Sequence, residues 1–240
     1  MKNFPMVLES INDLNKEQIE YLLHSANRLK CGYVPIGPRN LGRKHRPIIA
    51  TSFLENSTRT KHSFAIAIEK LGANYLDFNA ETSSIKKGES LEETLLTLYY
   101  QGVDMCIIRT SVSHELEKFK ERPPLQIING GDGIHQHPTQ ALLDLFTMNE
   151  IGFNPAGRTI AIIGDCIHSR VGHSLIDLIP QFGGKIILCG PHECIPDKSP
   201  HPDISLSTDL SEVLHKADIL YTLRIQKERH KEKADYYETY

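Results

Sequence analysis

Residues 50–72 read Ala-Thr-Ser-Phe-Leu-Glu-Asn-Ser-Thr-Arg-Thr-Lys-His-Ser-Phe-Ala-Ile-Ala-Ile-Glu-Lys-Leu-Gly, and they decide the fold class. An apolar run from Pro47 to Leu54 predicts a buried strand, and the helical spacing that follows predicts a helix ending at Gly72. Between them lies Ser-Thr-Arg-Thr, residues 57–60. A helix N-terminus has unpaired N–H groups and the positive end of the dipole, which makes this stretch a candidate phosphate site. Taken alone, Ser-Thr-Arg-Thr is more typical of a plain N-cap with a surface arginine, and no nucleotide P-loop pattern is present.

The composition is that of an ordinary globular protein, with 240 residues, 40% of them hydrophobic and 24% charged. The net charge of −3 predicts no general attraction to nucleic acid or to membranes. The sequence shows no signal peptide and no apolar run of membrane-spanning length, so we expect a cytoplasmic protein. The five cysteines have no C-x-x-C spacing, so we expect them to act as small apolar residues in a reducing compartment. They are Cys31, Cys106, Cys166, Cys189 and Cys194.

Strands alternate with helices along the chain, which predicts an α/β protein with parallel sheets covered by helices. Strands are expected at residues 47–54, 74–78, 103–109, 125–129, 159–165, 185–189 and 219–224. Further helices are expected at residues 12–30, 91–100, 171–182 and 209–216, with another ending near residue 150. The turn sequence Asn154-Pro-Ala-Gly157 predicts two parallel-sheet domains, at residues 1–150 and 151–240. Three strands are readable in the second domain, so we expect it to be truncated at its C-terminus.

Arginines recur at the ends of the expected strands. In open α/β sheets the ligand binds beyond the carboxyl ends of the strands, where this chain places Arg59, Arg109, His137, Gln140, Arg170, Arg224 and Gln226. Each arginine alone is typical of a solvated surface, but their recurrence at one topological place predicts a polyanion site. No pair of carboxylates and no Ser-His-Asp order accompanies them. His135 and His137 are spaced as metal ligands, but no third ligand is spaced with them, so we expect no metal.

Five motifs resemble, in the same order, those of the aspartate carbamoyltransferase catalytic subunits. They are Phe-x-Glu-x-Ser-Thr-Arg-Thr (53–60), Ser-Ser-x-x-Lys-Gly-Glu (83–89), Gly-Asp-Gly-x-x-x-His-Pro-Thr-Gln-Ala-Leu-Leu-Asp-Leu (131–145), Gly-Asp-x-x-His-Ser-Arg-Val (164–171) and Arg-Ile-Gln-Lys-Glu-Arg (224–229). The resemblance implies two α/β domains, the first binding carbamoyl phosphate and the second L-aspartate. It implies carbamoyl transfer from the first substrate to the amine of the second, in pyrimidine synthesis, without metal, cofactor or covalent intermediate.

The resemblance also implies a role for each matching residue. Ser57, Thr58, Arg59 and Thr60 would cradle the phosphate. Arg109 would bridge the phosphate and the carbonyl oxygen, to which His137 donates, and Gln140 would hold the carbamoyl NH₂ group. Arg170, Arg224 and Gln226 would bind the two carboxylates of aspartate. Ser83 and Lys87 would reach into the site of a neighbouring subunit of a homotrimer. Regulatory or dihydroorotase partner chains are further partners that the resemblance suggests.

Two alternatives stay open. Ornithine carbamoyltransferases, or transferases for another amino acid, share the phosphate motif but lack the Ser-x-x-x-Lys-Gly-Glu loop. A non-catalytic relative that binds carbamoyl phosphate or assembles with partners is the other alternative. Thr110 and Lys61 depart mildly from the family pattern, which often has histidine and arginine there. Relatives continue past the Arg-x-Gln motif with a His-Pro-x-Pro loop and a last helix, neither of which follows here.

Overall fold

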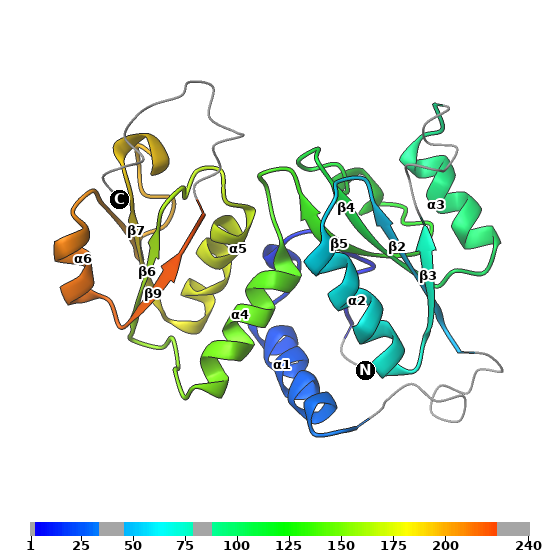
Figure 1. Cartoon of the computed structure of the whole chain (residues 1–240), viewed down its shortest axis with the longest axis horizontal. Coiled ribbons are helices and arrows are strands. Elements are labelled where there is room, and N and C mark those ends of the chain that lie inside the picture. The colour runs from blue at the N-terminus through cyan, green and yellow to red at the C-terminus, as the bar shows by residue number, and fades with distance from the viewer. Residues whose placement is uncertain (1–2, 34–45, 79–87, 225–240) are drawn as a thin grey trace. The chain divides into compact units, whose positions relative to one another are not determined.

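The computed structural model describes residues 3–33, 46–78 and 88–224 (Figure 1). The chain divides into two compact units, Met1–Thr139 and Gln140–Tyr240, and each unit contains its own parallel sheet. This division falls at the start of helix α4 (Pro138–Glu150). The boundary predicted at 150/151 lies at the end of that helix and stays a prediction. None of the helices in the described ranges has the length and apolarity needed to cross a bilayer.

The first unit is a five-stranded parallel sheet with the order β1-β5-β4-β2-β3. Its strands are β1 (Val7–Leu8), β2 (Ile48–Phe53), β3 (Asn74–Phe78), β4 (Met105–Thr110) and β5 (Gln126–Asp132). Its helices are α1 (Lys16–Lys30), α2 (Thr58–Leu71) and α3 (Leu91–Tyr100), with short 3₁₀ turns at Ile11–Asp13 and Glu117–Phe119. The chain runs outward from β2 to β3 and then returns to the other side of β2 to form β4, so the strand order reverses between β2 and β4.

Alternation along the strands sends side chains to both faces of this sheet. Ile107 of β4 packs on one face with Ile68 of α2, while its neighbour Ile108 packs on the other face with Leu95 of α3. All four side chains are buried. Burying each of them contributes about 1.5–3 kcal/mol, so the two helices fix both faces of the sheet and hold its strand ends in place.

The second unit has a four-stranded parallel sheet with the order β8-β7-β6-β9. Its elements after α4 are β6 (Thr159–Ile163), α5 (Arg170–Leu178), β7 (Lys185–Cys189), β8 (Ile204–Ser207), α6 (Leu210–Lys216) and β9 (Ile219–Thr222), with 3₁₀ turns at Pro180–Phe182 and His192–Cys194. Val213 of α6 packs on one face with Ala161 and Ile187. The strand order reverses between β6 and β9, as it does between β2 and β4 in the first unit.

The structure confirms the α/β class and most predicted elements, including α2, which ends at Gly72 with φ 79°. The prediction of three strands in the second domain is wrong for the described residues, because β8 is a fourth. Its sequence Ile-Ser-Leu-Ser is short and half polar, as suits an edge strand, and therefore gave a weak signal. The helix predicted to reach residue 182 ends at Leu178, since Pro180 has no N–H to continue it.

The cysteine prediction is correct for four residues and wrong for one. Cys106, Cys166, Cys189 and Cys194 are buried, whereas Cys31 is exposed after the last turn of α1. Burial raises the pKa of the Cys106 and Cys166 thiols to about 12, so they behave as the small apolar residues predicted.

Candidate active site

The predicted phosphate residues of the first unit lie at the point where its strand order reverses. Phe53, the last residue of β2, is paired with Arg109 of β4, and the Leu54 N–H donates to the Arg109 carbonyl at 2.8 Å. Ser57 follows Phe53 by four residues. In open parallel sheets this reversal opens a crevice at the carboxyl ends of two adjacent strands, where ligands bind. The structure therefore brings the start of α2 and Arg109 to one edge of the sheet.

The start of α2 is left available for an anion. Ser57 is extended (φ −155°, ψ 99°) and its side chain makes no capping hydrogen bond, and the first turn contains no acidic residue. By contrast, α1 and α3 begin with complete capping boxes, in which Gln18 and Glu93 reach back to the N-cap residue. The alternative of a plain capped helix is therefore not what the structure shows. The first-turn N–H groups and the exposed Arg59 fit a phosphate group.

Arg109 is held in place by a residue to which sequence analysis gave no role. Its side chain is almost fully buried, with the residue 8% exposed. The Nη2 atom donates to Glu55 Oε1 at 2.6 Å, and Nη1 donates to the Gly130 carbonyl at 3.3 Å. Glu55 stands between the strand end and the Ser57 turn, so it neutralises the arginine and directs it toward the edge where β2 and β4 end.

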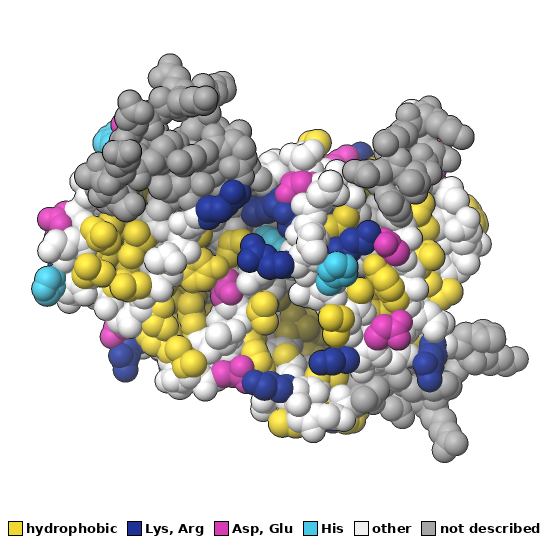
Figure 2. Space-filling model, in the orientation of Figure 1, with side chains coloured by type: hydrophobic (Ala, Val, Ile, Leu, Met, Phe, Trp, Pro, Cys, Tyr) yellow, Lys and Arg dark blue, Asp and Glu magenta, His cyan; other side chains and the backbone are white. Residues whose placement is uncertain are grey.

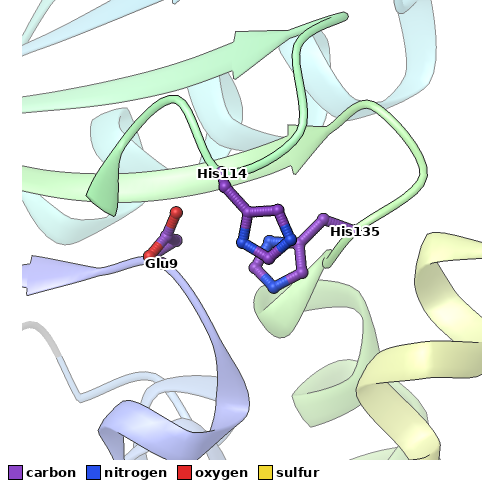
Figure 3. Close-up of side chains that lie close together, drawn as sticks. All are labelled: Glu9, His114 and His135. Carbon is purple, nitrogen blue, oxygen red and sulfur yellow. The ribbon is translucent and has the colours of Figure 1, made fainter. Parts of the chain in front are cut away.

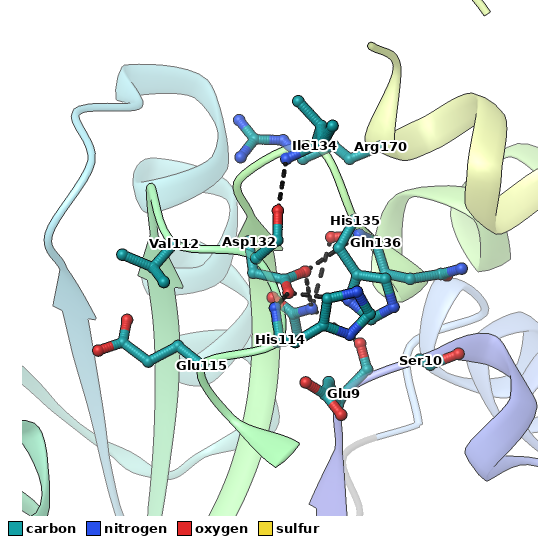
Figure 4. A network of polar contacts seen from close by, with 12 residues as sticks. Glu9, Ser10, Val112, His114, Glu115, Asp132, Ile134, His135, Gln136 and Arg170 are labelled. Carbon is teal, nitrogen blue, oxygen red and sulfur yellow. Dashed lines mark hydrogen bonds and ion pairs between the residues drawn. The ribbon is translucent and has the colours of Figure 1, made fainter. Parts of the chain in front are cut away.

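His137 lies on the segment that leads from β5 to α4 and is 5% exposed. Its Nδ1 atom is 3.3 Å from Thr139 Oγ1. A buried network fixes this segment, because Asp132 Oδ1 accepts from the Gln136 N–H at 3.0 Å (Figure 4). The same oxygen accepts from Asn129 Nδ2 at 2.7 Å. Gly133, with φ 45°, allows the close turn, since a Cβ there would lie 2.3 Å from Ser113 Oγ.

The Asp132 carboxylate stays ionised in this buried position. Burial would raise its pKa, but hydrogen bonds from His135, from Asn129 and from the His114 N–H outweigh burial and lower the pKa. The second unit has a similar pair, in which His168 Nδ1 lies 2.8 Å from Asp165 Oδ1. Both pairs come from the sequence Gly-Asp-x-Ile-His at the end of a strand, a short repeat to which the sequence gave no other pointer.

The predicted aspartate residues of the second unit also lie where the strand order reverses. Arg170 is the first residue of α5, which follows β6, and Arg224 follows the end of β9 by two residues. Ile163 and Thr222, near the ends of these two strands, are paired. Gly164 (φ 121°) lets the segments after β6 and β9 approach each other, because a Cβ there would lie 2.8 Å from the Leu223 carbonyl oxygen. Arg170 is partly buried and Arg224 is exposed.

Gln140 belongs to a side-chain relay that sequence analysis missed. Its Nε2 atom donates to Asp144 Oδ1 at 3.0 Å, and Tyr221 Oη donates to Asp144 Oδ2 at 2.8 Å. Burial raises the pKa of Asp144, and burial together with the Asp144 charge raises the pKa of Tyr221. Because the amide NH₂ group of Gln140 is engaged by Asp144, its oxygen is the end suited to accept a hydrogen bond from a ligand.

Three predicted residues, Ser83, Lys87 and Gln226, lie outside the described residues. Within the described part, the side chains whose ligand atoms lie close enough together to hold a metal ion are Glu9, His114 and His135. His137 is not among them, so the grouping differs from the His135–His137 pair considered from the sequence. Basic and acidic side chains are interspersed over the face shown in Figure 2, which agrees with the small net charge.

Comparison with known proteins gives a consistent result for both units. Residues 7–150 match the aspartate/ornithine carbamoyltransferase carbamoyl-P binding domain, and residues 156–240 match the Asp/Orn binding domain of the same family. An aspartate carbamoyltransferase catalytic subunit from Solibacter usitatus is 39% identical over 233 residues, which cover 95% of this chain and 76% of the relative. One from Streptococcus pyogenes is 37% identical over 225 residues, covering 93% of this chain and 70% of the relative.

Solved structures agree. Trypanosoma cruzi aspartate transcarbamoylase in complex with carbamoyl phosphate and aspartate has a TM-score of 0.80 at 32% identity, covering 94% of this chain and 74% of that one. The catalytic subunit of M. jannaschii aspartate transcarbamoylase has a TM-score of 0.76 at 32% identity, covering 96% and 78%. The matched domains span nearly the whole sequence and include both strand reversals described above. The chain therefore belongs to the aspartate/ornithine carbamoyltransferase family.

Proposed function

We propose that this protein transfers the carbamoyl group of carbamoyl phosphate to the amine of L-aspartate. The products are N-carbamoyl-L-aspartate and phosphate, an early step of de novo pyrimidine biosynthesis. The observation that carries the proposal is the start of α2, an uncapped helix N-terminus without acidic residues beside the buried Arg109. The names of the relatives and the T. cruzi complexes with carbamoyl phosphate and aspartate support the choice of substrates.

In this proposal carbamoyl phosphate is bound mainly by residues of the first unit. Ser57, Thr58, Arg59 and Thr60 bind the phosphate through hydroxyl, backbone and guanidinium donors. Arg109 binds both the phosphate and the carbonyl oxygen, and His137 donates to that oxygen as negative charge develops on it. The carboxylate of Glu55 keeps the Arg109 guanidinium in position before the ligand arrives. Gln140, oriented by Asp144, accepts from the carbamoyl NH₂ group.

The second unit supplies the aspartate site through Arg170 and Arg224, with Gln226 assisting. Two guanidinium groups suit a substrate with two carboxylates, since each can form paired, charge-assisted hydrogen bonds. With both substrates bound, the aspartate amine attacks the carbonyl carbon. The new C–N bond forms while the bond between the carbonyl carbon and the bridging oxygen breaks. Phosphate leaves with that oxygen and the electron pair, and it takes a proton from the amine. Positioning and charge stabilisation supply the rate gain.

Two arginine variants test this division of the site. Arg59→Ala is expected to weaken carbamoyl phosphate binding, whereas Arg224→Ala is expected to raise the aspartate KM and leave carbamoyl phosphate affinity near normal. Each variant should lose about 2–4 kcal/mol of transition-state binding, as for one charge-assisted bidentate pair. Steady-state kinetics together with calorimetry separates them. Equal loss of carbamoyl phosphate affinity in both variants would overturn the division.

We also propose that the protein acts in the cytoplasm as a homotrimer with shared active sites. Ser83 and Lys87 would complete the phosphate site of a neighbouring subunit, and regulatory or dihydroorotase chains are candidate partners. Mixing Arg59→Ala and Lys87→Ala subunits in equal amounts tests the sharing. With random assembly, about a quarter of the interfaces combine an intact Arg59 from one subunit with an intact Lys87 from its neighbour. Activity should return to roughly that fraction of the unmodified protein. A mixture as inactive as its parents, after verified subunit exchange, would refute the shared site.

A further inference from the structure

We propose that Glu9, His114 and His135 form a binding site for a divalent transition-metal ion of the zinc type, separate from the transfer chemistry. Each residue offers one ligand atom, and these atoms lie within 4.8 Å of one another (Figure 3). Glu9 follows β1, His114 follows β4 and His135 follows β5, which are adjacent parallel strands in the order β1-β5-β4. The three side chains therefore converge at the carboxyl edge of one sheet.

Glu9 brings a carboxylate oxygen that lacks a hydrogen-bond partner. The residue is 2% exposed, and its Oε2 atom pairs with Lys120 Nζ at 2.9 Å. Its other oxygen, Oε1, is buried and has no hydrogen-bond partner among the described residues. A buried, unsatisfied carboxylate oxygen is costly, and each such group in a native structure calls for an explanation. A cation bound to Oε1 supplies one without disturbing the pair with Lys120.

His135 is oriented as metal-binding histidines usually are. Its Nδ1 atom lies 2.9 Å from Asp132 Oδ2, and Asp132 is fully buried. When the Nδ1 hydrogen is donated to this carboxylate, Nε2 carries the lone pair that a metal requires. Carboxylate–histidine–metal arrangements of this kind fix the ring and raise the basicity of the ligating nitrogen. Asp132 is itself held by a hydrogen bond from Asn129 Nδ2 to its Oδ1 atom.

His114 is brought to the same place by its backbone. It has a φ of 62°, the one positive value among the described residues other than glycine. Its N–H donates to Asp132 Oδ2 at 2.8 Å, the oxygen that also contacts His135. The two imidazole rings lie with their centroids 3.6 Å apart and a tilt of 33°. A histidine held in this conformation requires support from its surroundings, and Asp132 Oδ2 provides it by accepting from the His114 backbone N–H. The same oxygen orients the ring of His135.

Two imidazoles and one carboxylate match the donor set that zinc uses when a water completes a tetrahedral site. Zinc–ligand distances near 2.0–2.2 Å would bring the ligand atoms to about 3.3 Å from one another, so binding would tighten the three segments. The site would join β1 to the loops after β4 and β5. Because His135 lies two residues before His137, the ion would act as a structural clamp on the segment that presents His137.

Zinc titration of untagged, chelator-stripped protein against a chromophoric chelator tests the proposal. We expect one Zn²⁺ per chain, lost or weakened at least about tenfold in Glu9→Gln, His114→Asn and His135→Gln. Asparagine is chosen at position 114 because it tolerates positive φ. His168→Gln is the matched control, since His168 has the same contact with an aspartate but no neighbouring ligand set among the described residues, and it should bind zinc normally.

Two further measurements make the result specific. Co²⁺ should give the visible absorption of a four-coordinate site in the unmodified protein and in His168→Gln, but not in Glu9→Gln. Saturating Zn²⁺, near 100 times Kd, should raise Tm by about 5 °C or more in the same two proteins. Glu9→Gln decides the matter, because it preserves shape and its fold can be checked by circular dichroism. Absent zinc binding, or binding that survives in folded Glu9→Gln and His135→Gln, would overturn the proposal.

Discussion

Replacing Glu55 by glutamine separates the structural role of the Glu55–Arg109 pair from its role in ligand binding. The pair is short, 2.6 Å between Arg109 Nη2 and Glu55 Oε1, and the two side chains are 9% and 25% exposed. Removing one partner of a fully buried pair costs about 3–5 kcal/mol, whereas exposed pairs contribute about 0–1 kcal/mol. Because the pair is partly buried, we expect Glu55→Gln to lower the free energy of unfolding by about 2 kcal/mol. That loss corresponds to a fall in Tm of roughly 4–8 °C.

The same substitution should strengthen phosphate binding. In the unmodified protein an arriving phosphate shares Arg109 with a carboxylate, whereas in Glu55→Gln the guanidinium has no competing anion at that contact. We expect the Kd for inorganic phosphate to fall a few-fold and at most about tenfold, the equivalent of 1.4 kcal/mol. Phosphate should therefore raise the Tm of Glu55→Gln more than that of the unmodified protein.

Thermal melts with and without phosphate, together with calorimetry, measure both effects. Asp218→Asn is the control, because Asp218 pairs with Arg158 at 2.9 Å in the other unit and both side chains are partly exposed. It should lower Tm by about 4 °C or less and leave phosphate affinity unchanged. A Glu55→Gln protein no less stable than Asp218→Asn, or equal stabilisation of the two variants by phosphate, would contradict these expectations.

Three further predictions follow from buried groups and close contacts. Gly164→Ala should lower the free energy of unfolding, measured with denaturant, by at least about 2 kcal/mol, and Gly152→Ala by only about 1 kcal/mol. Both glycines have positive φ, but only Gly164 is crowded, by the Leu223 carbonyl, so equal losses would contradict this prediction. Iodoacetamide should label one thiol per native chain, that of Cys31, and labelling of a buried cysteine before unfolding would show that the packing is wrong. Burial raises the pKa of Asp144 in the folded protein. The folding stability that Asp144 contributes is therefore present at low pH and is lost as pH rises through the raised pKa. The stability difference between the unmodified protein and Asp144→Asn should thus fall from pH 4 toward pH 7, and a constant difference would refute the assignment.

The local order of elements could be predicted because each signal lies within a few residues. The capping box that begins α1 consists of Asn15 and Gln18, three residues apart, and Gly72 ends α2 as expected. The strand β8 was missed because it has only four residues, two of them serines, which is too short for the alternation to stand out. The two-residue strand β1 gave no separate signal for a similar reason, since its pairing with β5 depends on residues 120 positions away.

Partners of the candidate site residues could not be predicted because they are distant in sequence. Glu55 and Arg109 are 54 residues apart, and Asp144 and Tyr221 are 77 residues apart. The grouping of Glu9 with His114 and His135 likewise depends on three loops that only the sheet order brings together. The sequence did predict that Arg109 and Arg224 lie at strand ends, since the carboxyl ends of parallel strands follow from the alternation of elements. That these ends form the binding site stays a prediction.

The most direct test of the central claim is product formation from carbamoyl phosphate with either L-aspartate or L-ornithine as acceptor. Mass spectrometry of the quenched reaction identifies the product, and phosphate release measures the rate. We expect N-carbamoyl-L-aspartate, formed in equal amount with phosphate and abolished or strongly reduced in Arg59→Ala. Carbamoylation of ornithine in preference to aspartate, or no transfer to aspartate by the folded protein, would contradict it.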